Sequence, residues 1–261
     1  DTVTAGNCYK YQYVVTDNVG NVDTATSASV AHTPFGAYYA FNAGSGTTAV
    51  DSSGNSNTGT LQAGAGWTTG KVGSNALSLN GTSTSWVDVA NPVVDTSQSY
   101  TVATWVKLNN LTGFQTFASI DGTSASAFYL QLQGGLFAMT VRTTDTTTGT
   151  EIKVPSLAAP TTGVWYHVVG VYDSSAQTLA LYVNGQLQGT TSFTSAWKGT
   201  GHTAVGRAKW SGGNVDFTNG ALDETRFYDR ALSASEIAGL ATGASAYYAL
   251  DAGSGTTAVD T

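Results

Sequence analysis

The chain has 261 residues, of which 17 are acidic and 10 basic, and its formal net charge is −7. Nucleic-acid binding needs clustered Lys and Arg to neutralise phosphates, so scarce and scattered positive charge argues against that class of partner. With 41% hydrophobic and 11% aromatic residues the chain is too apolar for a disordered protein, yet no apolar run approaches the roughly 18 residues that span a bilayer.

The first 35 residues carry a hairpin pattern. Tyr11, Tyr13 and Val15 alternate with other residues ahead of a turn-forming stretch at 17–21, and a second strand-like run covers 22–30. This pattern predicts a β-hairpin. The single cysteine, at position 8, excludes an intrachain disulfide and a Cys-based zinc site. Because the chain does not begin with Met, we expect a piece of a longer protein.

The segment that follows is predicted to be almost entirely β. Short runs rich in Val, Tyr, Phe, Trp and Thr are separated by clusters of Gly, Asn, Asp and Ser, and in the run 126–133 apolar residues alternate with Tyr and Gln. That alternation predicts one buried and one water-facing row. So many short strands imply a sandwich of two antiparallel sheets. Strands are expected at 37–41, 76–80, 85–90, 100–108, 115–120, 126–133, 136–142, 165–173, 178–184, 186–192, 203–207 and 221–229.

Two local signals are stronger than the rest. Asn184 and Gly185 lie between two apolar runs and predict a two-residue hairpin turn, because both turn positions require a positive φ. Ser233, followed three residues later by Glu236, has the form of a capping box and predicts a short closing helix over 234–241.

An internal repeat links the two ends of this segment. Residues 37–52 recur at 246–261 with three differences. We therefore predict a tandem array of similar domains, with 246–261 the start of the next copy. The tail has a sequence able to replace strand 37–41 in a neighbouring molecule, but the local strand is covalently closer, so we expect that strand to stay in place and the chain to be a monomer.

Several motifs follow one another along the middle of the chain: YYAFN at 38–42, DSSG at 51–54, ALSLNG at 76–81, YTVATWVK at 100–107, GVWYHV at 163–168, LYVNG at 181–185 and LDETRFYDRAL at 222–232. In this order they resemble the laminin-G-like, concanavalin-A-like jelly-roll domain of bacterial secreted and surface proteins, and further short matches are similar to its actinobacterial branch. The resemblance implies an all-β concanavalin-A-like jelly-roll sandwich of two antiparallel sheets with one short closing helix.

The resemblance also implies a domain organisation. Residues 1–35 resemble the C-terminal hairpin of a truncated immunoglobulin-like or fibronectin-III-like domain. Residues 36–243 are then the LamG-like jelly roll, and 244–261 the start of a following repeat.

A bound calcium ion is a further implication of the resemblance. Ca²⁺ takes oxygen ligands, which Asp51, Asn55 and Asn57 offer in a turn-rich stretch. Asp223 is in phase with Phe227 along its strand and would face the core, where a carboxylate must be paired or metal-bound. We expect these four residues to hold Ca²⁺ and chelation to lower the melting temperature. The alternative is that Asp51 and Asn55 only cap turns.

For sugar binding, the candidates are aromatic side chains in loops, which stack on the apolar faces of sugar rings, and polar groups that bind hydroxyls. Trp197 and Trp210 fall in Gly- and Ser-rich stretches, and Asp121, Asn214 and Asp216 are candidate polar contacts. The alternative for Trp210 is that it packs over the edge of the sandwich.

Catalysis is not expected. Glycoside hydrolysis needs two carboxylates facing one cleft, and the three Glu residues, at 151, 224 and 236, do not form the Glu-x-Asp-x-Glu arrangement of jelly-roll glucanases. Asp223 and Glu224 are neighbours, and strand alternation would turn them to opposite faces. His167, in a strand with aromatic neighbours, is interpreted as structural.

We therefore expect a non-catalytic carbohydrate-binding or adhesive module of a large multidomain protein that is secreted or on the cell surface. Its expected partner is a polysaccharide or cell-surface glycan, with other surface proteins as further candidates, and no membrane insertion. The alternatives are a structural spacer or protein-binding adhesin repeat and, with less support, a glycosidase.

Overall fold

The computed structural model describes residues 8–9, 12–16, 22–26, 30–31 and 35–243. The chain divides into two compact units, one of residues 34–244 and one of residues 1–33 with 245–261. In the second unit β1 (Cys8–Tyr9) pairs with β4 (Val30–Ala31), and β2 (Gln12–Thr16) pairs antiparallel with β3 (Val22–Thr26) where the hairpin is predicted. The immunoglobulin-like identity of this hairpin stays a prediction, and the repeat at 246–261 lies outside the described residues.

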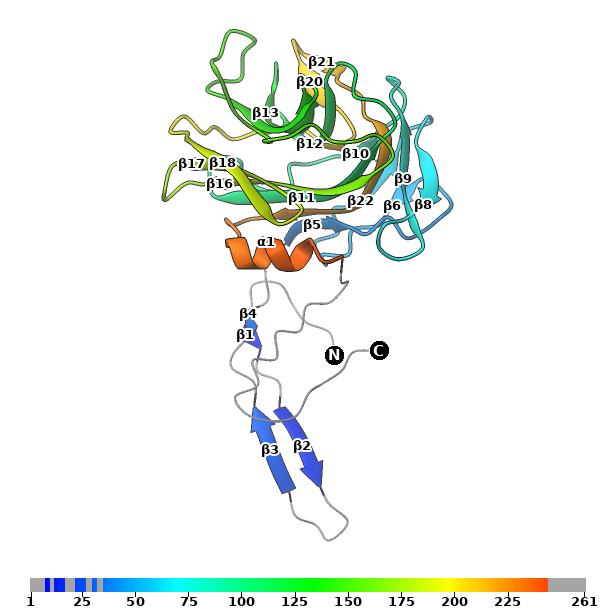
Figure 1. The fold of residues 1–261 in the computed structure, drawn as a ribbon, viewed down its shortest axis with the longest axis vertical. Coiled ribbons are helices and arrows are strands. Elements are labelled where there is room, and N and C mark those ends of the chain that lie inside the picture. Colours follow the sequence, from blue (N-terminus) through cyan, green and yellow to red (C-terminus); the bar gives the residue numbers. More distant parts are fainter. Residues whose placement is uncertain (1–7, 10–11, 17–21, 27–29, 32–34, 244–261) are drawn as a thin grey trace. The chain divides into compact units, whose positions relative to one another are not determined.

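The larger unit is a sandwich of two antiparallel sheets (Figure 1). We call the sheet drawn uppermost in Figure 1 the front sheet and the other the back sheet. The strands of the front sheet are, in order of pairing, β15 (Glu151–Pro155), β14 (Leu136–Arg142), β13 (Ser126–Gln133), β12 (Gln115–Asp121), β19 (Thr203–Val205), β10 (Val87–Val89), β7 (Gly59–Leu61) and β6 (Thr48–Ala49).

The back sheet lies beneath the front sheet in Figure 1. Its strands are, in order, β18 (Gln186–Ser192), β17 (Thr178–Val183), β16 (Trp165–Asp173), β11 (Tyr100–Leu108), β22 (Asn219–Tyr228), β9 (Asn75–Asn80) and β8 (Gly66–Thr69), and β5 (Phe35–Tyr39) also pairs with β22. A separate hairpin is formed by β20 (Ala208–Trp210) and β21 (Gly213–Val215).

The hydrophobic core fills the space between the sheets. Phe128 and Leu130 of β13 pack there with residues of the back sheet such as Val102 and Phe227. Tyr129, which alternates with them, is therefore turned to the outer face of the front sheet. The predicted division of 126–133 into two rows is thus confirmed.

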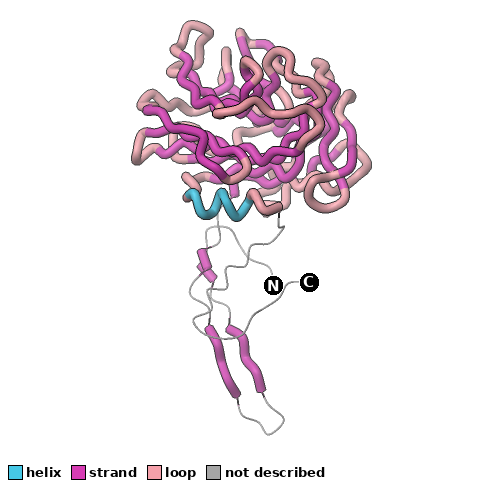
Figure 2. The backbone as a smooth tube through the Cα atoms, in the orientation of Figure 1, coloured by secondary structure: helices cyan, strands magenta, loops and turns pink. Residues whose placement is uncertain are grey.

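A short helix, α1 (Ala234–Leu240), covers the outer face of the back sheet. Ile237 and Leu232 form a second buried cluster with Ala103 and Val169 of that sheet. Ser233 caps the helix in the predicted capping box. The remainder of this unit consists of strands and loops (Figure 2), and no helix among the described residues has the length and apolar character needed to cross a membrane.

The predicted turn at 184–185 is also confirmed, with φ of 50° at Asn184 and 77° at Gly185. Six strands of the larger unit were not predicted: β6, β7, β8, β15, β20 and β21. They have two to five residues each, too few to show a clear alternation.

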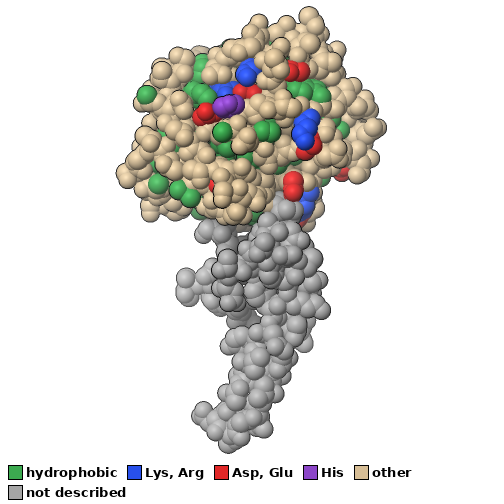
Figure 3. Space-filling model, turned by 180° about the vertical axis from the view of Figure 1, so that it is seen from behind, with side chains coloured by type: hydrophobic (Ala, Val, Ile, Leu, Met, Phe, Trp, Pro, Cys, Tyr) green, Lys and Arg blue, Asp and Glu red, His purple; other side chains and the backbone are tan. Residues whose placement is uncertain are grey.

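The surface agrees with the scarcity of charge in the sequence. In Figure 3 charged side chains are few on the face shown, and the hydrophobic ones form small separate groups. That face has no broad apolar area of the kind that marks a large protein interface.

Candidate functional site

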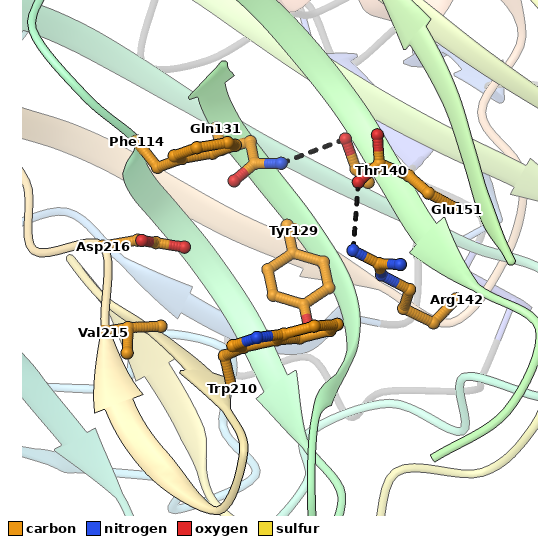
Figure 4. A pocket seen from close by; sticks show the side chains of 9 residues that line it. All are labelled: Phe114, Tyr129, Gln131, Thr140, Arg142, Glu151, Trp210, Val215 and Asp216. Carbon is orange, nitrogen blue, oxygen red and sulfur yellow. Dashed lines mark hydrogen bonds and ion pairs between the residues drawn. The ribbon is translucent and has the colours of Figure 1, made fainter. Parts of the chain in front are cut away.

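A cavity of about 290 Å³ opens on the outer face of the front sheet. Three aromatic side chains, five polar or charged side chains and one valine surround it (Figure 4). Its lining consists of Phe114, Tyr129, Gln131, Thr140, Arg142, Glu151, Trp210, Val215 and Asp216. We call this cavity, together with the smaller cavity described below, the groove.

The floor of the groove is the row of side chains that alternates with the core residues. Tyr129 and Gln131 come from β13, and Thr140 comes from β14, where its hydroxyl accepts a 3.0 Å hydrogen bond from the Gln131 amide. Tyr129 is 4% and Gln131 3% exposed, because the surrounding walls cover them. The row predicted to face water is therefore largely buried, and it forms the floor of the cavity.

Two aromatic side chains stand on opposite sides of the cavity, Phe114 on a loop and Trp210 on β20 (Figure 4). The hairpin that carries Trp210 turns at Ser211 and Gly212, which have φ of 52° and 77°. This two-residue turn follows the same rule as the one at 184–185, so the Ser-Gly pair was a signal available in the sequence. Trp210 lines the cavity, although packing over the sandwich edge was an alternative.

The charged groups of the cavity differ in their pairing. The Arg142 guanidinium lies 3.1 Å from the Glu151 carboxylate and 4.4 Å from the centre of a Trp210 ring. Asp216, on the opposite side in Figure 4, has no hydrogen bond to its carboxylate within the described part of the chain, and burial raises the pKa of this carboxyl above its ordinary value.

A second cavity, of about 280 Å³, adjoins the first. Phe114 and Asp216 line both cavities. The other residues around the second cavity are mostly uncharged and polar: Gly81, Asn110, Thr112, Gln115, Phe217 and Asn219. The groove therefore has an aromatic part and a polar part that meet at Asp216.

Of the five predicted ligand contacts, the structure brings Trp210 and Asp216 into the groove. Trp197 does not line either cavity, and its indole N–H donates a 2.9 Å hydrogen bond to the Arg142 carbonyl. Asn214 is exposed on β21. Asp121 is only 1% exposed, and its carboxylate is occupied by Arg207 at 2.7 Å, so it does not face a ligand.

The groove also contains residues that the sequence analysis missed. Glu151 is a second carboxylate in the cavity that Asp216 lines, and Arg142, Phe114 and Tyr129 also belong to its lining. The alternation in 126–133 places Tyr129 on the outer row, but no pattern in the sequence joins that row to loops some 15 to 90 positions away.

The residues predicted to bind calcium fall into two separate hydrogen-bond networks. Both oxygens of Asp51 accept hydrogen bonds, at 2.8–3.0 Å, from the backbone amides of Tyr38, Ser53 and Asn57 and from the Ser53 hydroxyl. Asn55 and Asn57 donate their side-chain amides to the carbonyl of Gly36. Asp51, Asn55 and Asn57 therefore cap turns and join them to the start of β5, and both Asp51 oxygens already accept hydrogen bonds.

Asp223 lies in the other network. Its Oδ2 accepts hydrogen bonds from the backbone amides of Lys71 and Val72, while the buried Oδ1 has no partner among the described residues. The register of β22 on β11 shifts between Ala103 and Trp105, which puts Asp223 on the face opposite Phe227. The expectation that it faces the core is therefore wrong, although the residue is fully buried beneath 71–72.

The same irregularity affects Glu224, whose φ is +52°. Its carboxylate accepts a 2.8 Å hydrogen bond from the Tyr38 hydroxyl and is paired with Arg226. Strict alternation, on which the expected opposite orientation of Asp223 and Glu224 rests, is interrupted here. Within the described part of the chain, no group of three or more His, Cys, Asp or Glu side chains is arranged to hold a metal ion.

Calcium binding remains a prediction from the resemblance, and Asp223 suits a cation better than Asp51 because one of its oxygens is unpartnered. If the ion binds, excess chelator should lower the melting temperature of the wild type, since a ligand of the native state stabilises it by mass action. The Asp223→Asn variant should lose this response. Identical wild-type melting curves with and without chelator, and no metal by elemental analysis, would contradict the prediction.

Comparison with known proteins agrees with this architecture. The family model described as the concanavalin A-like lectin/glucanases superfamily matches residues 80–238. No curated protein sequence matches the chain. Domain 4 of AbnA, an extracellular GH43 arabinanase from Geobacillus stearothermophilus solved with arabinotriose, is similar at a TM-score of 0.65 and 25% identity, over 80% of this chain and 98% of that one.

Two more distant structures share the fold. The ligand-binding domain of botulinum neurotoxin serotype D, in complex with N-acetylneuraminic acid, matches at a TM-score of 0.60 and 14% identity over 80% of this chain and 51% of that one. Trypanosoma rangeli sialidase matches at 0.57 and 16% over 78% of this chain and 32% of that one. Together with the family match over most of the jelly roll, the two-sheet architecture places this chain in the concanavalin A-like lectin/glucanase superfamily, as a lectin-like jelly-roll domain.

Proposed function

We propose that this protein is a non-catalytic carbohydrate-binding module and that the groove on the front sheet is its glycan site. The observation that carries the proposal is the lining of the larger cavity, where aromatic side chains surround amide, hydroxyl and charged groups. Aromatic faces suit the apolar faces of sugar rings, and a few fixed polar groups orient the hydroxyls.

Phe114 provides the clearest support within the groove. Its side chain is 51% exposed, although burial of a Phe normally stabilises a fold. The neighbouring Gln115 side chain donates hydrogen bonds to the Asn110 carbonyl and side chain, both at 3.0 Å, which organises the loop that carries Phe114. A loop held in this way presents an aromatic ring to solvent at the rim of a cavity.

The comparisons support the same class of ligand. The arabinanase domain, which matches over nearly its whole length, was solved with arabinotriose, and the neurotoxin domain was solved with N-acetylneuraminic acid. We further propose that the module belongs to a large multidomain protein that is secreted or on the cell surface, in line with the repeat of 37–52 at 246–261. A spacer or protein-binding adhesin is the competing function, and neither requires a cavity lined by aromatic and polar side chains.

Hydrolysis is the second competing function, because Glu151 and Asp216 line one cavity. Hydrolysis requires one carboxyl group to donate a proton and another to act as base or nucleophile. Glu151 is held by Arg142 at 3.1 Å, by Lys153 at 3.7 Å and by the Gln133 amide at 3.0 Å. This pairing fixes Glu151 as part of the cavity wall, and we expect bound oligosaccharides to be recovered intact.

Replacing Phe114 by Ala should weaken glycan binding about tenfold, the effect of losing one aromatic stacking surface and its apolar area. Because the ring is half exposed, the melting temperature should change little. Trp210→Ala should weaken binding at least as much. The measurement is titration calorimetry of the full chain with the oligosaccharides that give the highest signals on a glycan array.

Each variant has a matched control on the back sheet. Leu187 is 49% exposed on β18, and Trp165 on β16 is half-buried with Lys107 over its ring at 4.9 Å, much as Arg142 lies over Trp210. Leu187→Ala and Trp165→Ala should bind as the wild type does. Equal losses in the groove variants and their controls would place the site elsewhere, and silence across the array would favour the spacer or adhesin.

A further inference from the structure

The carboxylate of Asp216 stands where the two cavities of the groove meet. Asp216 and Phe114 are the residues common to both linings. A ligand that fills either cavity therefore lies next to Asp216, and an oligosaccharide that extends from one cavity into the other passes it.

The charges around the groove leave Asp216 uncompensated. Among the residues lining the larger cavity, the other charged ones are Arg142 and Glu151, which form an ion pair at 3.1 Å. Asp216 is the only charged residue in the lining of the second cavity. Both parts of the groove thus have a net charge of −1, within a chain whose net charge is −7.

Hydrogen bonds hold the backbone that carries Asp216 in place. The Asp216 carbonyl accepts a 2.7 Å hydrogen bond from the Thr116 amide, and the Thr218 hydroxyl donates a 2.7 Å hydrogen bond to the Thr116 carbonyl. Asp216 itself has φ of +57°, a conformation that Asp and Asn tolerate better than other non-glycine residues. The segment is therefore attached to β12 at Asp216 and again at Thr218.

Resting on the glycan-binding function proposed above, we infer that Asp216 is a specificity-determining residue that restricts the groove to uncharged glycans. An ionised carboxylate can only accept hydrogen bonds, so it matches the hydroxyl donors of a neutral sugar. A carboxylate of a uronic or sialic acid placed beside it would bring two negative charges together without a free cation in the lining. Known neighbours do not decide between these classes, because arabinotriose is neutral and N-acetylneuraminic acid is anionic.

The test uses a matched pair of ligands. The neutral oligosaccharide with the highest array signal is compared, by calorimetry with the full chain at low ionic strength, with the same oligosaccharide oxidised to a carboxylate at a primary hydroxyl. For the wild type we expect the neutral form to bind at least about tenfold more tightly. This difference lies in the lower part of the range expected from Coulomb repulsion between two like charges a few Å apart in partly hydrated surroundings. High salt should reduce this preference.

Asp216→Asn removes the charge and keeps a residue that tolerates the backbone conformation, so the fold should be retained. This variant should bind the oxidised oligosaccharide almost as well as the neutral one, and the preference should fall about tenfold. The control is Asp173→Asn on the back sheet, which changes the net charge equally and should leave the preference unchanged.

Three outcomes would overturn the inference. A wild-type preference near unity would do so, as would a preference that survives in Asp216→Asn while neutral glycans still bind; in both cases the proposed glycan-binding function stands. If no array glycan, neutral or acidic, binds the wild type, the proposed function fails and the inference fails with it.

Discussion

Arg207→Met is expected to lower the free energy of unfolding by about 3–5 kcal/mol, because it leaves a buried carboxylate without its charge partner. Arg207 is 2% and Asp121 1% exposed, and one guanidinium nitrogen lies 2.7 Å from both oxygens of Asp121. After the replacement Asp121 would retain Lys209 at 3.6 Å and the Ser126 hydroxyl at 3.3 Å. Such a loss is a large part of the stability of an ordinary domain.

Urea unfolding followed by tryptophan fluorescence measures this effect in the jelly roll, since all six Trp residues lie between positions 67 and 210. The matched control is Lys198→Met, which breaks a solvent-exposed pair with Asp95 at 2.9 Å and should cost less than about 1 kcal/mol. The double variant Arg207→Met with Asp121→Leu should recover part of the loss. Similar costs for the buried and exposed pairs would contradict the account.

The variants Asp223→Asn and His167→Gln are expected to change the pH dependence of stability in opposite directions. Both side chains are buried on the back sheet, next to Trp105 on β11, which pairs with each of them. Burial, with a contribution from Glu224, raises the pKa of Asp223 to about 6. Burial, with a contribution from the charge of Arg226, lowers the pKa of His167 to about 3.

The two residues act over the same pH window with opposite signs. Between about pH 6 and pH 4 the native state takes up a proton at Asp223 that the unfolded chain does not, so this residue makes stability rise as the pH falls. Below about pH 6.5 the unfolded chain takes up a proton at His167 that the native state does not, so this residue makes stability fall. In the wild type the two contributions largely offset each other.

Asp223→Asn should therefore lose about 2 kcal/mol relative to the wild type between pH 7 and pH 4.5, and His167→Gln should gain about 2 kcal/mol. Urea unfolding at several pH values, in excess chelator so that no metal ion is bound at Asp223, measures both. Other titrating groups cancel because each variant is compared with the wild type. The double variant should return to the pH dependence of the wild type. Parallel curves for all four proteins would show that neither group titrates in this way.

Much of the fold follows from local patterns in the sequence. The turn at Asn184 and Gly185 and the capping box at Ser233 depend on residues within four positions of one another. The strand at 126–133 is marked by the alternation of apolar residues with Tyr and Gln over 128–133. Each of these patterns involves only residues that are close in the sequence, so the turn, the helix start and the strand can be predicted without the tertiary structure.

The candidate site depends on contacts between distant residues, which these patterns do not contain. Asp121 does not face the groove because its carboxylate is paired with Arg207, which lies 86 positions away in the sequence. Asp223 changes face because of a register shift against β11. Phe114 and Trp210 line opposite sides of one cavity. They do so because the loop that carries Phe114 and the hairpin that carries Trp210 both lie beside the outer side chains of β13. Composition and alternation cannot reveal such pairings.

A crystal structure of the full chain with the oligosaccharide that binds most tightly tests the central claim most directly. We predict a sugar ring in the groove between Phe114 and Trp210, with hydroxyls within hydrogen-bond distance of Asp216. A sugar bound on the back sheet, or beside Trp197 outside the groove, would contradict it.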